Sequence, residues 1–184
     1  MADNFLISTG AGPSAIRAVD ISSDLYVPVH VGSPYSDEAI STTVSATEYT
    51  LGDVVDTKLT FSNVNLATGR GVKLVNATLL QTTVATAGTP AYDLIFFNQD
   101  LTTTAPVDNA ALNITAPDLV NIESYISFVN KIDVGGGSIF TATPNAILTP
   151  NTTGLYAIIR AANTFTLGSV TSTGIKLVLQ FEQL

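Results

Sequence analysis

Few side chains in this sequence are suited to acid–base or zinc chemistry. His30 is the only histidine, it lies between Val29 and Val31 in an apolar run, and the chain has no cysteine. A Ser–His–Asp triad needs an activated serine, and no nucleophile elbow is present in the sequence. Zinc needs three or four histidine, cysteine or carboxylate ligands. We therefore expect no catalytic residue and no zinc site, and we interpret His30 as a satisfied or surface histidine.

Carboxylates are the other groups that could bind a metal or cleave a glycosidic bond. Asp20 with Asp24, or Asp53 with Asp56, could offer oxygen ligands to calcium, but the spacing of an EF-hand is absent. Glycosidases need two positioned carboxylates, and among 15 acidic residues some pair will lie close together by chance. We interpret these residues as solvated acids in turns, and we expect no metal, no cofactor and no enzymatic activity.

Glycine and asparagine motifs give no stronger signal. The run Gly135, Gly136 and Gly137 lacks the lysine and the following helix of a phosphate-binding loop, so it predicts a flexible loop. Glycosylation sequons occur at three asparagines, and the abundance of threonine and asparagine accounts for them without glycosylation. These asparagines are Asn76, Asn113 and Asn151.

Tyrosines are candidates for stacking on sugars. The four considered are Tyr26, Tyr35, Tyr49 and Tyr156. Tryptophan, a common platform for sugar stacking, is absent from the sequence. We expect these tyrosines to fill the core and the interfaces instead.

The composition is apolar and weakly charged for a chain of 184 residues. Charged residues make up 12% of it, and the mean hydropathy is +0.36. No run reaches the roughly 18 apolar residues of a membrane helix, so the apolar character is spread over many short segments. Such a chain is either a domain partly covered by partners or an ordinary β domain with a surface rich in threonine and asparagine. We favour the covered domain.

The net charge of −8 argues against binding to nucleic acid. The seven basic residues are scattered, whereas a surface that follows phosphates needs clustered cations. The first twelve residues carry no basic side chain, and the apolar run Phe5, Leu6 and Ile7 is too short for a signal-peptide core. We expect synthesis in the cytoplasm and no membrane partner.

The chain divides into an extended N-terminal arm, residues 1–24, and one β domain, residues 25–184. Gly10, Gly12 and Pro13 favour irregular backbone in the arm. Pro28 lacks a donor N–H, which favours an edge or bulged strand at 25–31. A turn is expected at 86–90. The expected strands are 25–31, 43–50, 54–61, 72–82, 92–98, 125–132, 155–161 and 175–181.

Three of these segments carry more detailed expectations. In strand 54–61 Val55, Leu59 and Phe61 share one face. In strand 72–82 the alternation places Val72, Leu74 and Leu80 on one face. The apolar strand 92–98 is expected to be buried on both sides.

One short helix is expected near Pro117. Proline suits the first helical position, and Asp118 would lie near the positive end of the helix. Leu119, Ile122 and Ile126 would share one face. Many short strands with Gly, Pro and Asn turns indicate an all-β, antiparallel sandwich or jelly roll with this one short helix.

The order of several segments resembles a group of small phage virion proteins encoded among head genes. The resemblance covers roughly residues 50–184 and contains no catalytic signature. Its segments are GVKLVNATLL at 71–80, YDLIFFN at 92–98, DNAAL at 108–112, GLYAIIR at 154–160 and LVLQF at 177–181.

This resemblance implies a capsid decoration, or cement, protein that forms a homotrimer on the outer capsid surface. Its partners would be copies of itself and the major capsid protein, which we expect the N-terminal arm to contact. One alternative is a tail, neck or fibre-tip structural protein, with host-glycan binding as a further option. A second alternative is an enzyme such as a capsular depolymerase.

Overall fold

A computed structural model describes most of the chain. The described residues are 15–20, 26–31, 35–42, 44–62, 64, 71–128, 130–151, 154–168 and 174–184, with backbone only up to residue 42. The chain separates into two units, Met1–Tyr35 and Ser36–Leu184.

The first unit contains an antiparallel hairpin. Strand β1 (Ala15–Asp20) pairs with β2 (Tyr26–Val31), and Ala18 lies opposite Pro28. Each strand of a two-stranded sheet has one open side, which agrees with an edge position for Pro28. The paired residues 15–20 differ from the irregular backbone favoured by the sequence, and the predicted division between residues 24 and 25 stays a prediction.

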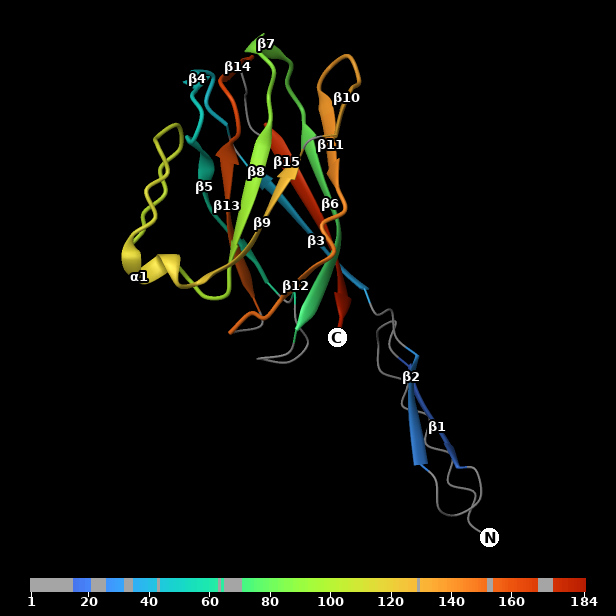
Figure 1. The fold of residues 1–184 in the computed structure, drawn as a ribbon. Coiled ribbons are helices and arrows are strands. Elements are labelled where there is room, and N and C mark those ends of the chain that lie inside the picture. Colours follow the sequence, from blue (N-terminus) through green and yellow to red (C-terminus); the bar gives the residue numbers. More distant parts are fainter. Residues whose placement is uncertain are drawn as a thin grey trace. The chain divides into compact units, whose positions relative to one another are not determined.

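The second unit is built on two antiparallel sheets, which Figure 1 shows as two layers. The larger sheet has the order β10–β11–β6–β15–β3, and β12 pairs with β6 beyond the end of β11. Its strands are β3 (Tyr35–Thr42), β6 (Val72–Gln81), β10 (Asn130–Asp133), β11 (Ser138–Ala142), β12 (Ala146–Leu148) and β15 (Ile175–Gln183).

The smaller of the two layers has the order β5–β13–β8–β9. These strands are β5 (Val54–Phe61), β8 (Tyr92–Phe97), β9 (Ile122–Phe128) and β13 (Leu155–Ala161). A third sheet of three short strands lies in the order β4–β14–β7, from β4 (Glu48–Tyr49), β7 (Ala85–Gly88) and β14 (Phe165–Leu167).

The hydrophobic core lies between the two layers. Leu79 from β6 and Leu177 from β15 belong to the same buried cluster as Phe96 from β8 and Ile159 from β13. Side chains alternate between the two faces of a strand, so each layer contributes one face to this core. The prediction of an all-β antiparallel sandwich with one short helix is confirmed.

A bulge changes the face pattern of β6. The pairing with β15 shifts between Gln180 and Phe181, where Val75 of β6 is the extra residue. Val72 and Leu74 are buried before it, but Leu79 is buried after it and Leu80 is only half-buried. The prediction that Leu80 shares a face with Val72 and Leu74 was therefore wrong, because one extra residue reverses the parity.

Strand β8 is buried on both sides, as its continuous apolar sequence predicted. Its outer face, with Ile95 and Phe97, forms a second cluster with Val54 and Ile158. The cover comes from the segment between β8 and β9, residues 98–121, shown in yellow beside β5 in Figure 1. Its side chains Leu101, Leu112 and Ile114 pack on this cluster.

Helix α1 (Ala116–Leu119) is a single turn, which agrees with the short helix expected near Pro117. Pro117 is in the first turn as expected, but Ile122 already begins β9, and Leu119 and Ile122 are exposed. The predicted shared face of Leu119, Ile122 and Ile126 does not form. The reason is that four residues are too few to repeat a helical face.

Asp118, near the end of the covering segment, binds the backbone near the start of the same segment. Its buried carboxylate accepts hydrogen bonds from the backbone N–H groups of Thr102, Thr103 and Thr104, at 2.9, 3.0 and 2.6 Å. These bonds, led by that of Thr102, hold the pKa of Asp118 below its usual range because they stabilise the ionised form.

Two local predictions about strand and turn positions were wrong. Residues 85–88 form β7 instead of the expected turn at 86–90, because they pair with β14. Within the expected strand at 43–50, the described residues 44–50 contain only the two strand residues of β4. Short strands of this kind depend on partners far away in the sequence, which local patterns do not reveal.

The Asp118 network predicts how stability depends on pH. In Asp118→Asn a neutral amide replaces the carboxylate, and its NH2 group cannot accept hydrogen bonds from the backbone N–H groups. We therefore expect a lower Tm at neutral pH. A depressed folded pKa contributes stability that is complete above the unfolded value of about 3.9 and is lost as the pH falls below it. The Tm difference from the wild type should therefore narrow below about pH 4 in thermal scans. Asp100→Asn, at an exposed ion pair with Lys58, is the control and should change Tm little.

Candidate functional site

The structure brings Asp56, one of the acidic candidates from the sequence, next to the carboxylate of Asp108. Asp108 accepts hydrogen bonds from the Tyr49 hydroxyl and the backbone N–H of Asp56, both at 2.8 Å. Burial, followed by the charge of Asp108, raises the pKa of Asp56. Asp53 instead accepts from the backbone and hydroxyl of Thr50, at 2.7 and 2.9 Å. Its carboxylate is therefore engaged in closing the turn that precedes β5.

These carboxylates do not assemble a metal centre. In the part of the chain that the structure describes, no three His, Cys, Asp or Glu side chains cluster as metal ligands would. Only the backbone of Asp20 is described, and Asp24 lies outside the described residues. The predicted absence of metal and cofactor sites stays a prediction.

The histidine and the N-terminal tyrosines are described only as backbone. His30 lies in β2 opposite Ile16, Tyr26 begins the same strand, and Tyr35 begins β3. Their side chains lie outside the described residues, so their roles stay predictions.

The other two candidate tyrosines occupy different environments. Tyr49 is fully buried in the core, and its ring centroid lies 5.4 Å from that of Phe165. Tyr156 is half-buried on the outer face of β13, where Lys58 Nζ lies 5.4 Å from its ring centroid. Tyr49 therefore fills the core as predicted. The ring of Tyr156 lies within cation–π distance of Lys58.

The glycine run lies in a turn, and two of the three sequon asparagines lie outside the strands. Gly135 and Gly137 belong to the turn between β10 and β11, and Gly135 has a φ of 83°. A Cβ on Gly137 would approach the carbonyl oxygen of Gln81 to 2.1 Å, so the turn needs glycine at that position. Asn113 and Asn151 are exposed, whereas Asn76 is half-buried within strand β6.

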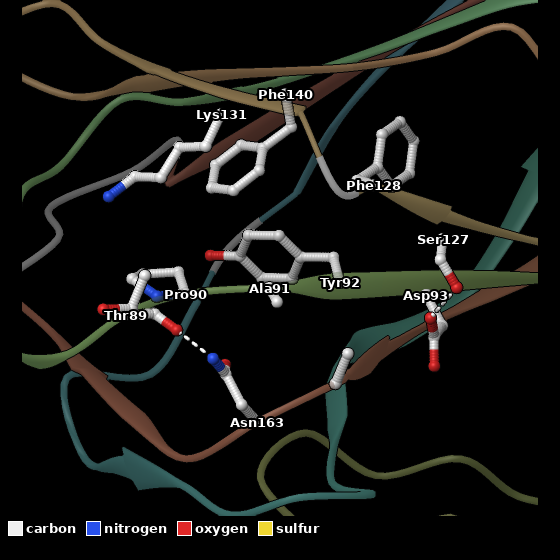
Figure 2. A pocket seen from close by; sticks show the side chains of 11 residues that line it. Thr89, Pro90, Ala91, Tyr92, Asp93, Ser127, Phe128, Lys131, Phe140 and Asn163 are labelled. Atoms are coloured by element: carbon white, nitrogen blue, oxygen red, sulfur yellow. Dashed lines mark hydrogen bonds between the residues drawn. The ribbon is translucent and has the colours of Figure 1, made fainter.

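A cavity of about 340 Å³ opens where the ends of β8 and β9 approach the hairpin of β10 and β11. Figure 2 shows Tyr92 at its centre, between Phe140 above and Asn163 below. The ring centroids of Tyr92 and Phe140 lie 5.2 Å apart, edge to face. Lys131 lies at one side of the cavity, and Asp93 with Ser127 lies at the other (Figure 2).

Several polar groups around this cavity are engaged in hydrogen bonds or ion pairs. The Tyr92 hydroxyl donates to Gln81 Oε1 at 2.8 Å, and burial raises the pKa of Tyr92, so the phenol stays protonated. Lys131 pairs with Asp133 at 2.9 Å. Asp93 accepts from Arg160 and from the Ser127 hydroxyl. The arrangement can seat an apolar group against the aromatic rings of Tyr92 and Phe140.

Exposed apolar side chains lie at the rim of the sandwich. Ile132 is 59% exposed and Val134 is 57% exposed at the outer edge of the larger sheet, and Ile147 of β12 is 64% exposed. Sequence reasoning missed this edge because it treated residues 125–132 as one strand, whereas β9 and β10 belong to different sheets. The only sequence signal was that two apolar residues, Ile132 and Val134, flank Asp133 just before the glycine run.

No protein-family model and no curated protein matches the sequence. Two solved structures are similar at 14% identity: the VP2 subviral particle of infectious bursal disease virus, with a TM-score of 0.22, and a structure of the Gt strain of that virus, with a TM-score of 0.21. They cover 96% and 98% of this chain, and the chain spans about half of theirs, 49% and 50%. Among the described helices, none is long and apolar enough to cross a membrane.

The contacts of Tyr92 predict a structural role for the centre of the cavity. Tyr92→Phe would leave the buried Gln81 Oε1 without its donor, which should lower the free energy of unfolding by about 1–2 kcal/mol. Tyr125→Phe, on a side chain that is 69% exposed, should leave it unchanged. Urea denaturation measures both variants, and an equal loss in both would contradict this role for Tyr92.

Proposed function

We propose that the protein is a structural component of a bacteriophage particle, and most specifically a capsid decoration, or cement, protein. The observation that carries the proposal is the weakly charged β-sandwich with exposed apolar side chains, Ile132 and Val134, at the outer edge of its larger sheet. Apolar residues at sheet edges are usually avoided unless another chain covers them. The resemblance of residues 50–184 to small phage virion proteins supports the same conclusion.

Decoration requires a rigid body that engages several capsid subunits at once. A packed β-sandwich loses little conformational entropy when it docks. In a homotrimer, three linked contacts would raise the avidity by roughly 100- to 10,000-fold over a single contact. Three-fold symmetry would also match the local three-fold positions of an icosahedral shell.

We assign the contact with the major capsid protein to the N-terminal unit. Residues 1–35 are a unit separate from the sandwich and contain the β1–β2 hairpin. An arm that engages a neighbouring subunit would leave the sandwich free to contact other decoration proteins. The negative net charge of the chain favours the outer capsid surface, away from packaged DNA.

Binding to phage heads tests this function directly. The purified chain should be a stable oligomer in analytical ultracentrifugation. It should add to heads that lack decoration and raise the temperature at which they release DNA. A chain that starts at Ser36 should keep the fold by circular dichroism and lose most of its binding to heads.

The location in the particle separates decoration from a tail, neck or fibre-tip role. Antibody labelling of intact particles should give signal across the whole head surface. Signal restricted to one vertex or to the tail would contradict decoration and favour the alternative virion role. A monomer that does not bind heads would contradict the proposal as a whole.

A further inference from the structure

Strand β10 is an open edge of the larger sheet. It stands first in the order of that sheet and pairs with β11 on one side only, among the residues that the structure describes (Figure 1). It is a short strand that begins at Asn130 and ends at Asp133, just before the turn at Gly135. Open strand edges are templates for pairing with another chain.

The hydrogen-bonding pattern fixes which backbone groups face outward. The N–H of Val134 donates to the carbonyl of Gly137 at 3.0 Å, and hydrogen-bonded and non-hydrogen-bonded pairs alternate along an antiparallel ladder. Ile132 therefore points its backbone groups toward β11. Lys131 and Asp133 direct their N–H and C=O groups to the open side.

An apolar row ends at this edge. Ile132 lies opposite Ile139 of β11, which lies opposite Leu80 of β6. Neighbouring Phe140 and Leu79 are in the core, so this row lies on the opposite face of the sheet, turned away from the core. Ile139 and Leu80 are half-buried, while Ile132 at the end of the row is 59% exposed. The row therefore ends at an exposed side chain, and a further strand beside β10 would cover Ile132.

We propose that β10 pairs with β10 of a second copy of this chain, antiparallel, about a two-fold axis that passes beside Ile132. Lys131 of each copy then exchanges two backbone hydrogen bonds with Asp133 of the other. Ile132 faces its own counterpart in the closer, non-hydrogen-bonded position. The apolar row continues across the junction, from Leu80 of one copy to Leu80 of the other.

The charges of β10 favour this register over its neighbours. With the axis beside Ile132, each lysine faces an aspartate, next to the pair that Lys131 and Asp133 already form within the chain. An axis through Lys131 would place two lysines opposite each other, and an axis through Asp133 would place two carboxylates opposite each other. Like charges directly opposite destabilise a strand pair. One register therefore satisfies both the backbone groups and the charges.

The contact closes at two copies and is small. An isologous pair uses the same strand on both sides, so it does not build a three-fold ring and would instead join one oligomer to the next. A strand pair of this length is below the size of a stable interface, so the free chains should associate weakly and gain strength when they are held side by side. The pairing goes beyond the proposed function, because it requires no particular particle or location.

Cysteine cross-linking tests the pairing. The chain has no cysteine, so Ile132→Cys introduces a single thiol, at a position where the Cα atoms of the two copies would lie about 4.5 Å apart, within the range for a disulfide. Under mild oxidation this variant should form disulfide-linked dimers about tenfold more than Ile147→Cys, an equally exposed isoleucine of the same sheet. Equal yields from the two variants would overturn the pairing.

Charge reversal tests the register. Asp133→Lys in the Ile132→Cys background places lysines opposite each other and should lower the dimer yield about tenfold. Adding Lys131→Asp exchanges the two charges and should restore the yield, which separates the cross-strand effect from misfolding. A dimer yield that does not respond to Asp133→Lys, or that the double exchange does not restore, would overturn the proposed register. Head binding without cross-linking would overturn the pairing alone, and cross-linking without head binding would overturn the decoration function alone.

Discussion

Burial of apolar side chains between two facing sheets is the constraint on which the rest of this structure depends. Each strand of the two layers has to turn one apolar face inward, and β8 is apolar on both faces because residues 98–121 cover its outer side. The positions of the loops, the bulges and the single helical turn follow from the need to complete this burial. Asp118 contributes by holding the covering segment in one conformation.

Much of the architecture follows from the sequence because the alternation of apolar residues is a local signal. It correctly indicated β5, β8, β13 and β15, and the continuous apolar run predicted the two-sided burial of β8. It failed at Leu80, where a bulge at Val75 reversed the faces, and a bulge depends on the partner strand. It also failed at β7 and β14, two short strands that exist only through pairing with each other and with β4.

The candidate site was harder to predict than the fold. Of the carboxylates that the sequence singled out, Asp53 closes a turn and Asp56 lies next to Asp108. The cavity around Tyr92 collects residues from five separate segments of the chain. No local pattern joins such residues, because their proximity is a product of sheet order. The edge formed by Lys131, Ile132 and Asp133 was hidden for the same reason, since its exposure depends on which strand ends the sheet.

The covering segment 98–121 limits how copies of this molecule can be arranged. It occupies the broad outer surface over the start of β5 and the middle of β8, where another layer would otherwise lie. Another copy on that side would meet this segment and not the sheet, whereas among the described residues the β10 edge of the larger sheet stays open. A second copy joined through β10 as proposed would lie beside the sandwich and leave the covering segment outside the contact.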